Sequence, residues 1–562
     1  MKIFHCFRKG LGCGGGCPIR AGLAAFPLRI DRYAIVLVFL AQVLFFPYFP
    51  KMNSANELSR LYLALAMVEN RNFEITPFIS RFGNINDKSV IRDTVTVDGK
   101  AHRSERFYSD KPPGTALVAA PAIALRHLVA GFTCLRGDMR LARLFVCILP
   151  TLLLLGLMRR EMEELGVGSP VRAIAILGYG LGTLAMPYSV TYLAHQPVAV
   201  MLYAIWFLLR RRPEPPSLKA AAGAGFLAGF CLMTEYQAAV YLLPLAVLFL
   251  VRVRPLARGL PVAIAAAAIP LAFLAFYHHQ SFGGVLQTGY NHIANPFFAS
   301  VHQKGFMGVL YPGWTQFAGS FFLPSKGLFV FSPFLLLGFV GIVSYFRVAG
   351  RIDGAFRLAQ ILLPALFVSS MVYWDGGWTV GQRHLTPMIP FLIAPAALLM
   401  QRSLAAGIAA PGLVGASIMY TGLATVVYPH LPENIPNPFH DLTIPLFKGG
   451  CLAQVFVLTE LPSYAVLWVL AAVIFLALAL AAVLRFVSSS EMPRPGARRI
   501  AAAVAAVILL AAIPAGWYGW TSQVARLDSA AAAKHRVYFE DQCRAAGRWN
   551  DVDPDAGQTC GE

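Results

Sequence analysis

Long apolar stretches alternate with short polar ones along almost the whole chain. Fourteen apolar segments, many of them near the length of a bilayer crossing, recur between residues 33 and 518. A helix needs about 20 predominantly apolar residues to cross the hydrocarbon core of a membrane. The pattern therefore predicts an all-α, polytopic membrane protein.

The basic clusters between these segments indicate how the chain crosses the bilayer. Clusters such as "LLRRRPEPPSLK" and "MPRPGARR" would change sides if all fourteen segments crossed, against the rule that positive loops stay in the cytoplasm. Segment 113–131 is interrupted by Arg126 and His127, so we expect it to form an interfacial or re-entrant helix. About thirteen spans then remain.

This topology divides the chain into three parts. Residues 1–32 are expected to form a cytoplasmic basic tail, residues 33–518 the membrane domain, and residues 519–562 an extracytoplasmic tail. The outer loops comprise residues 50–140, 278–327 and 429–462, and they hold most of the polar, aromatic and histidine-bearing sequence. Chemistry is therefore predicted on the outer face.

Composition changes this picture little. The chain has 57% hydrophobic and 13% charged residues, and its net charge of +19 comes from short clusters between apolar segments rather than from one continuous face. These clusters are typical of topology signals, so nucleic acid is not expected as a partner.

The nine cysteines match no standard zinc spacing. Those in or near apolar segments are expected to face lipid or to pack as small hydrophobes, whereas two in the carboxy-terminal tail could close a disulfide if that tail is outside. The first group is Cys134, Cys147, Cys231 and Cys451, the tail pair is Cys543 and Cys560, and Cys6, Cys13 and Cys17 lie in the amino-terminal tail.

The first outer loop carries two pairs of charged residues. Apolar positions in "NELSRLYLALAMVENRNF" follow helical spacing and predict an amphipathic helix along the membrane surface, with Glu57 and Arg60 at its start. In "FYSDKPPG", Asp110 and Lys111 precede two prolines where the next helix begins. Either set could be an ordinary interfacial charge, but a lysine at this depth can also bind a lipid-borne phosphate.

Other candidates stand at the outer ends of apolar segments, where an ionisable residue is by default a site hypothesis. Glu235 needs a polar partner among its apolar neighbours. His195 could equally be a packing residue, and the Trp, Gly and Arg residues of "YWDGGWTVGQRHLTP" could equally be an interface anchor. From that stretch we select Asp375, Trp378 and Arg383.

Several reaction classes lose support because their motifs are missing from the sequence. It contains no Walker motif, dinucleotide fingerprint, HExxH or GxSxG. No ligand cluster requires a metal, so no cofactor is expected, although a divalent metal stays possible.

The same stretches resemble a known family. "ELSRLYLALAMVENRNF" followed by "FYSDKPPG" resembles the first outer loop of GT-C glycosyltransferases of the protein O-mannosyltransferase and aminoarabinose lipid A transferase type. "GGWTVGQRHLTPMIPFL", "KGLFVFSPFLL" and "LMTEYQAA" are also similar to segments of that group. The resemblance implies a polyprenyl-phosphate-linked sugar as donor, inversion at the anomeric carbon, and a site on the extracytoplasmic face of a bacterial inner membrane.

The resemblance also implies residue roles. Glu57 stands at the family's catalytic acid, which is usually Asp, and Arg60 stands at its Arg. Asp110 replaces a Glu, Lys111 is the lysine expected to touch the carrier phosphate, and Arg383 matches a late basic residue. Glu57 is the preferred proton acceptor, with Asp110 as the second acid.

The acceptor, whether protein, lipid or glycan, is not indicated. Two alternatives stay open: a lipid-linked glycan flippase or other transporter, and a non-catalytic assembly subunit.

Overall fold

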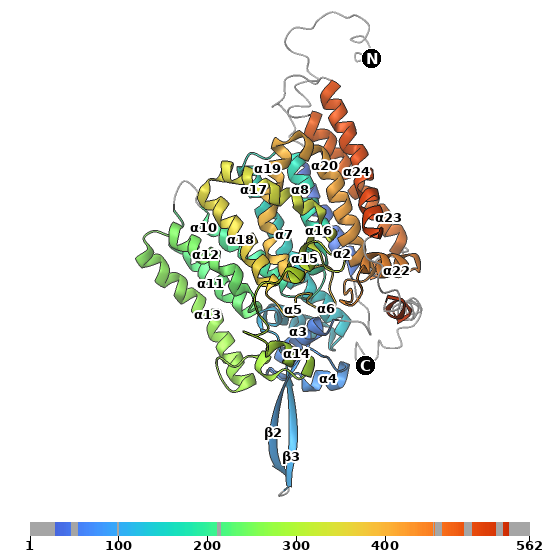
Figure 1. The fold of residues 1–562 in the computed structure, drawn as a ribbon. Coiled ribbons are helices and arrows are strands. Elements are labelled where there is room, and N and C mark those ends of the chain that lie inside the picture. Colours follow the sequence, from blue (N-terminus) through green and yellow to red (C-terminus); the bar gives the residue numbers. More distant parts are fainter. Residues whose placement is uncertain are drawn as a thin grey trace, which may run out of the picture.

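The computed structural model describes residues 29–46, 54–97, 100–210, 215–452, 454–455, 463–487, 497–523 and 532–538. Helices dominate these residues, as predicted (Figure 1). Six of the described helices have the length and apolar composition to cross a membrane, and further apolar helices are shorter. The protein is thus a multi-pass membrane protein, and the number of thirteen crossings stays a prediction. The six are Leu135–Glu164, Leu256–Phe282, Arg351–Ser369, Leu404–Val427, Tyr464–Val487 and Ala497–Gln523.

The first third of the described chain contains the first expected span and the large loop after it. Its short strand β1 (Phe45–Phe46) pairs antiparallel with β4 (Gln454–Val455) from the late part of the chain. The other elements are α2 (Ile30–Leu44), α3 (Ala55–Leu65), η1 (Ala66–Asn70), α4 (Thr76–Phe82), β2 (Ser89–Val97), β3 (Lys100–Tyr108), α5 (Gly114–Ala130), α6 (Leu135–Arg143), η2 (Leu144–Ile148) and α7 (Leu149–Glu164).

The remaining elements form the bulk of the helical bundle and its later loops. They are α8 (Ser169–Gly182), α9 (Ala185–Ser189), α10 (His195–Leu209), α11 (Leu218–Thr234), α12 (Ala238–Arg252), α13 (Leu256–Phe282), η3 (Gly289–His292), α14 (Pro296–His302), α15 (Trp314–Phe321), α16 (Leu328–Phe331), η4 (Pro333–Leu335), α17 (Leu336–Ala349), α18 (Arg351–Ser369), η5 (Arg383–Met388), α19 (Pro390–Arg402), α20 (Leu404–Ser417), η6 (Ile418–Gly422), α21 (Leu423–Val427), η7 (Phe439–Thr443), α22 (Ile444–Lys448), α23 (Ser463–Val487) and α24 (Ala497–Gln523).

The helix α3 is buried inside the protein on both its apolar and its polar side. Leu61 and Leu65 are fully buried, but so are Glu57 and Arg60 on its more polar side. A second hydrophobic core, formed with α5, α6 and parts of α11 and α13, surrounds the helix. The amphipathic pattern thus reflects polar partners inside the protein rather than water or lipid headgroups.

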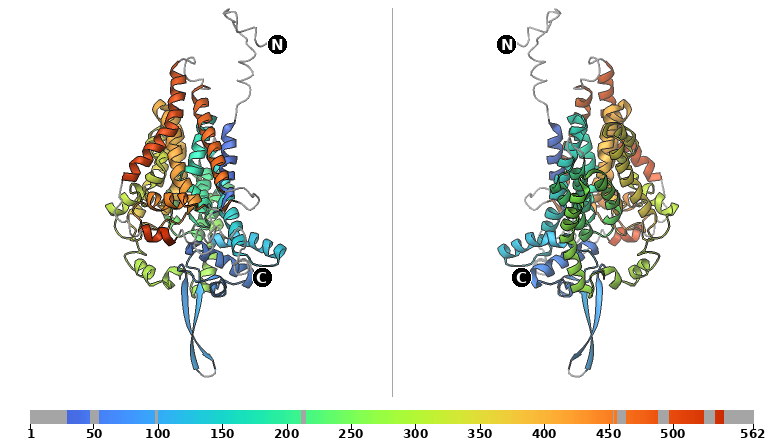
Figure 2. Two further views of the ribbon diagram at one scale, coloured as in Figure 1. Left: turned by 90° about the vertical axis from the view of Figure 1, so that its right-hand side faces the viewer. Right: turned by 90° about the vertical axis from the view of Figure 1, so that its left-hand side faces the viewer.

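A β-hairpin that the sequence analysis did not predict follows α4. Strands β2 and β3 pair antiparallel with Ser89 opposite Tyr108, and the hairpin projects away from the helical body (Figures 1 and 2). Cross-strand ion pairs join Arg92 to Glu105 at 2.9 Å and Arg106 to Asp93 at 2.6 Å. The hairpin marks one end of the molecule, which we call the hairpin end.

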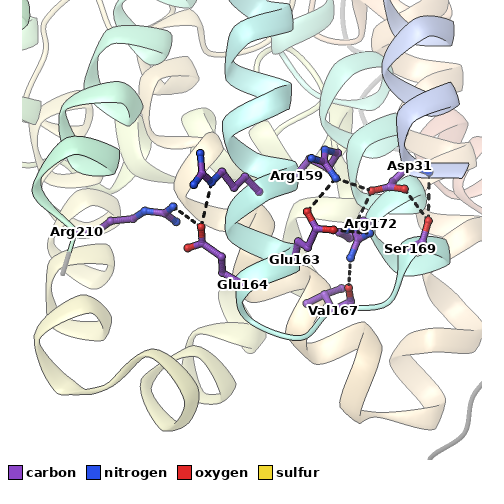
Figure 3. A network of polar contacts seen from close by, with 9 residues as sticks. Asp31, Arg159, Glu163, Glu164, Val167, Ser169, Arg172 and Arg210 are labelled. Atoms are coloured by element: carbon purple, nitrogen blue, oxygen red, sulfur yellow. Dashed lines mark hydrogen bonds and ion pairs between the residues drawn. The ribbon is translucent and has the colours of Figure 1, made fainter. Parts of the chain in front are cut away.

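A separate polar network ties α2 to the turn between α7 and α8 (Figure 3). The buried carboxylate of Asp31 accepts hydrogen bonds from Ser169 Oγ at 2.7 Å and from Arg172 Nε at 2.9 Å. Arg159 bridges Asp31 and Glu163, and Arg172 also donates to the Val167 carbonyl. The network fixes the entry of the chain into the bundle.

The cysteines depart in part from expectation. Cys147 and Cys231 are buried free thiols, as predicted for packed small hydrophobes. Cys134 and Cys451 are buried too, but both are disulfide-bonded, which corrects their reading as simple packing residues. The predicted Cys543–Cys560 disulfide and the amino-terminal cysteines lie outside the described residues.

Candidate functional site

Buried and half-buried charged residues from five parts of the chain gather at the hairpin end. They come from α3, from the segment before β2, from the segment between β3 and α5, from the turn between α11 and α12, and from the segment that leads into η5. The start of α10 adds His195. The structure therefore brings together most of the residues selected from the sequence.

Lys111 binds two carboxylates. Its Nζ atom lies 3.0 Å from Asp110 Oδ2 and 3.0 Å from Asp87 Oδ2, and only 11% of its side chain is exposed. Burial alone would lower the pKa of Lys111, but Asp110 and Asp87 raise it above its ordinary value, so the lysine stays charged. Asp110 also accepts a hydrogen bond from Ser59 Oγ at 3.4 Å.

The second buried pair joins Arg60 to Glu235. Arg60 Nη2 lies 3.3 Å from Glu235 Oε2, and the guanidinium also donates to Asn56 Oδ1 at 3.0 Å and to Thr115 Oγ1 at 3.2 Å. Glu235 thus has the polar partner that its apolar surroundings demand. The pair ties α3 to the turn before α12 and brings the positive charge of Arg60 close to that of Lys111.

Arg383 differs from the other cations of the site. No described carboxylate forms an ion pair with it, and its Nε atom is buried without a hydrogen-bond partner. Asp375 accepts the Gly377 backbone N–H at 2.8 Å instead. Gly376 has φ +70°, and a Cβ there would meet Arg383 Nε at 3.1 Å, so the glycine allows the backbone to approach the guanidinium.

The charge of Arg383 reaches the rest of the cluster. Its positive charge, like that of Lys111, lowers the pKa of Asp87. Arg383 also interacts electrostatically with His195. The buried His195 ring lies edge to face with His384, with centroids 5.3 Å apart. His384 follows Arg383 directly in the chain.

Glu57 belongs to a neighbouring network. Its Oε1 atom accepts from Arg143 Nε at 2.9 Å and from the Tyr192 backbone N–H at 2.5 Å, and His430 Nε2 lies 3.2 Å from Oε2. The carboxylate is fully buried. Burial would raise its pKa, but Arg143 and then His430 lower the pKa to about 2. Both carboxylate oxygens of Glu57 therefore face cationic or donor groups of the protein, and its role as the proton acceptor stays a prediction.

Lys326, which the sequence analysis did not select, holds the segment before η5. Its fully buried Nζ atom donates to the carbonyls of Gly377, Thr379 and Leu431 at 2.6, 2.8 and 3.2 Å. Trp378, between two of these acceptors, is 40% exposed and packs edge to face on His535, with centroids 5.6 Å apart. Trp378 therefore lies at the rim of the cluster.

Sequence reasoning missed several partners. Asp87 lies in "NINDKS", where nothing distinguishes it from a solvated loop acid. Arg143 looked like one more charge beside an apolar run. Lys326 begins a stretch that was quoted only for its resemblance, and it could have been found as a lysine flanked by apolar residues. Among the described residues, no group of three His, Cys, Asp or Glu residues could hold a metal ion.

Fold and site together define a helical, multi-pass membrane protein with a buried cluster of paired charges at one end. No model of a known protein family matches the sequence, and no curated protein matches it. Among solved structures, the chain is similar to ArnT from Cupriavidus metallidurans in the apo state, with 15% identity, 90% of this chain and 78% of that chain covered, and a TM-score of 0.45. The same figures, with 89% of this chain covered, hold for ArnT bound to undecaprenyl phosphate.

The chain is also similar to arabinosyltransferase EmbB from Mycobacterium smegmatis, with 17% identity and a TM-score of 0.40. That match covers 92% of this chain and 43% of the other.

Proposed function

We propose that the protein is a membrane glycosyltransferase that moves a sugar from a polyprenyl-phosphate carrier to a hydroxyl or similar group of an acceptor. The carrier would enter from the bilayer, and transfer would take place at the extracytoplasmic face of a bacterial inner membrane. The observation that carries this proposal is the unpaired, partly buried guanidinium of Arg383 beside the Lys111 cluster, at one end of an apolar helix bundle.

A phosphodiester suits this arrangement. An arginine without an anionic partner in a water-poor site is costly, and a phosphate oxygen satisfies it through charge-assisted hydrogen bonds. Lys111 supplies a second positive charge. Lys111 and Arg383 both lower the pKa of Asp87, so both charges are felt at one carboxylate. Lys111 and Arg383 would therefore hold the carrier phosphate.

The same two cations would favour the reaction itself. When the bond between the anomeric carbon and the phosphate oxygen breaks, the phosphate gains negative charge. Fixed positive groups near that oxygen stabilise the growing charge, and removing one such group from an active site costs about 10²–10³ in rate. Attack by the acceptor from the face opposite the phosphate gives inversion.

The other selected residues receive supporting roles. Asp110 is held by Ser59 through one oxygen and binds Lys111 through the other. It would thereby orient the Lys111 ammonium toward the phosphate. The Arg60–Glu235 pair adds positive potential and fixes α3. His195, Asp375 and Trp378 would line the space for the sugar and the acceptor.

Glu57 would position α3 against Arg143 and the segment at His430. It would act on the reaction through these neighbours.

The test is transfer by purified protein in nanodiscs supplied with a panel of radiolabelled polyprenyl-phosphate sugars and membrane extract as the source of acceptor. Arg383→Ala should lower transfer by about 10²-fold or more. Arg258→Ala, at an exposed arginine of α13, should leave transfer unchanged. Wild-type protein that transfers no sugar from any donor would refute the proposal.

A further inference from the structure

Transfer to a hydroxyl needs a group that takes its proton, and the structure offers two carboxylates that touch the proposed phosphate-binding lysine. They differ in how fully they are engaged. Asp110 uses both oxygens, with Oδ1 on Ser59 and Oδ2 on Lys111. Asp87 uses only Oδ2, at 3.0 Å from Lys111. Within the described residues, no group donates a hydrogen bond to Asp87 Oδ1.

Asp87 is also the more accessible of the two. Its side chain is 17% exposed, against 8% for Asp110. Asp87 is therefore easier to reach from outside the protein than Asp110, and it also lies within the electrostatic influence of Arg383.

The backbone holds Asp87 in this position. The next residues are fixed to the segment after α13, because Ser89 Oγ donates to the Gly289 carbonyl at 2.7 Å and the Ala294 N–H donates to the Lys88 carbonyl at 3.0 Å. These bonds fix the backbone directly after Asp87, and a catalytic group needs such support from its surroundings.

We propose that Asp87 is the proton acceptor of the transfer, a role that rests on the proposed function. The acceptor O–H gives its proton to Asp87 Oδ1 as the oxygen lone pair forms the bond to the anomeric carbon. The electrons of the bond between that carbon and the phosphate oxygen leave with the carrier phosphate, which Lys111 and Arg383 hold. Asp87 loses a negative charge as the phosphate gains one, so the charge around Lys111 stays constant.

Binding of the donor would prepare Asp87 for this role. Burial alone would raise its pKa, but Lys111, Arg383 and Arg60 hold the pKa of Asp87 below its ordinary value. A bound phosphodiester would take up part of this positive charge and add a negative one, and both changes raise the pKa of a neighbouring carboxylate. The other titratable groups that face Asp87 are Asp110 and Tyr373.

The experiment compares wild type with Asp87→Asn in nanodiscs, using the polyprenyl-phosphate sugar that wild type accepts. The matched control is Asp93→Asn, which removes an exposed carboxylate of the same hairpin. We expect Asp87→Asn to lower kcat by about 10²–10⁴-fold, with donor KM and the Kd of undecaprenyl phosphate within about threefold of wild type. The acidic limb of the kcat profile against pH should disappear.

Two outcomes overturn the inference alone. Turnover by Asp87→Asn within about threefold of wild type would exclude a proton acceptor. Parallel loss of undecaprenyl phosphate binding and transfer would show that Asp87 acts only by holding Lys111. If Asp87→Asn does not fold, Asp87→Ser takes its place, and Asp87→Glu should keep at least tenfold more activity than either. Wild type without transfer would refute the proposed function itself, and this inference with it.

Discussion

Replacing Glu57 by Gln would remove one charge from a site that has no exposed surface. The variant keeps an acceptor for the Tyr192 N–H but leaves Arg143 as a buried cation without its carboxylate. The side chains of both partners are completely buried. Breaking a buried ion pair by removing one partner typically costs about 3–5 kcal/mol.

The pKa of Glu57 leads to a similar magnitude. A change from an ordinary 4.5 to about 2 corresponds to about 3 kcal/mol, at about 1.36 kcal/mol per pKa unit. Because the pKa is lower in the folded state, this stability is fully present above pH 4.5 and is lost as the pH falls toward 2. Wild type should therefore exceed Glu57→Gln by about 3 kcal/mol at pH 7 and by about 1 kcal/mol at pH 3.

The assay is unfolding of the purified proteins in mixed micelles with increasing SDS, followed by tryptophan fluorescence at both pH values. Other carboxylates also titrate in this range, but they are common to both proteins and cancel in the difference. The double variant Glu57→Gln/Arg143→Met should recover part of the loss, because it removes the buried cation together with its carboxylate partner. A difference below about 1 kcal/mol at pH 7, or the same difference at both pH values, would refute the reasoning.

Three further changes separate binding from stability. Lys111→Ala should weaken undecaprenyl phosphate binding by about 10- to 100-fold, since a charged hydrogen bond contributes about 1.5–3 kcal/mol; vesicle flotation with the labelled lipid measures this. Lys326→Met removes a buried donor from the carbonyls of Gly377, Thr379 and Leu431, of which only those of Gly377 and Leu431 keep a bond from Thr379. Hydrogen exchange should therefore show faster opening around Thr379. Arg172→Ala should lower the free energy of unfolding by about 3–5 kcal/mol yet leave lipid binding unchanged. Unfolding in SDS measures the first effect and vesicle flotation the second.

The apolar pattern was sufficient for the helical class because a spanning helix must be long and apolar whatever it packs against. The need of Glu235 for a partner was also visible in the sequence, since no neighbour in the chain could pair with it. The identity of that partner was not visible, because Arg60 lies 175 positions away. Glu57 and Arg60 looked like the polar side of a surface helix, because one helical pattern fits both a headgroup layer and a set of buried ion pairs.

The hairpin β2–β3 could have been predicted. "SVIRDTVTV" and "KAHRSERFY" flank an Asp-Gly pair, the strongest short-range signal of a hairpin, and β-branched residues favour the first strand. The expectation of a purely helical loop concealed it. Asp87 could not have been selected, because its significance comes from Lys111 on the other side of the hairpin and from Arg383 in a late segment.

The charges of the cluster explain why Asp87, just before the hairpin, is suited to exchange its ion pair with Lys111 for a proton. Lys111, Arg60 and Arg383 contribute three positive charges, and Asp87, Asp110 and Glu235 contribute three negative ones. Buried cations without partners would destabilise the protein, and the carboxylates pair with Lys111 and Arg60. Under the proposed function, a phosphate would replace part of this pairing. Glu235 lies at the end of α11, and Asp110 also accepts a hydrogen bond from Ser59 of α3, whereas Asp87 forms an ion pair only with Lys111 among the described residues. Of the three carboxylates, Asp87 is therefore the one that can exchange its cation for a proton without disturbing the bundle.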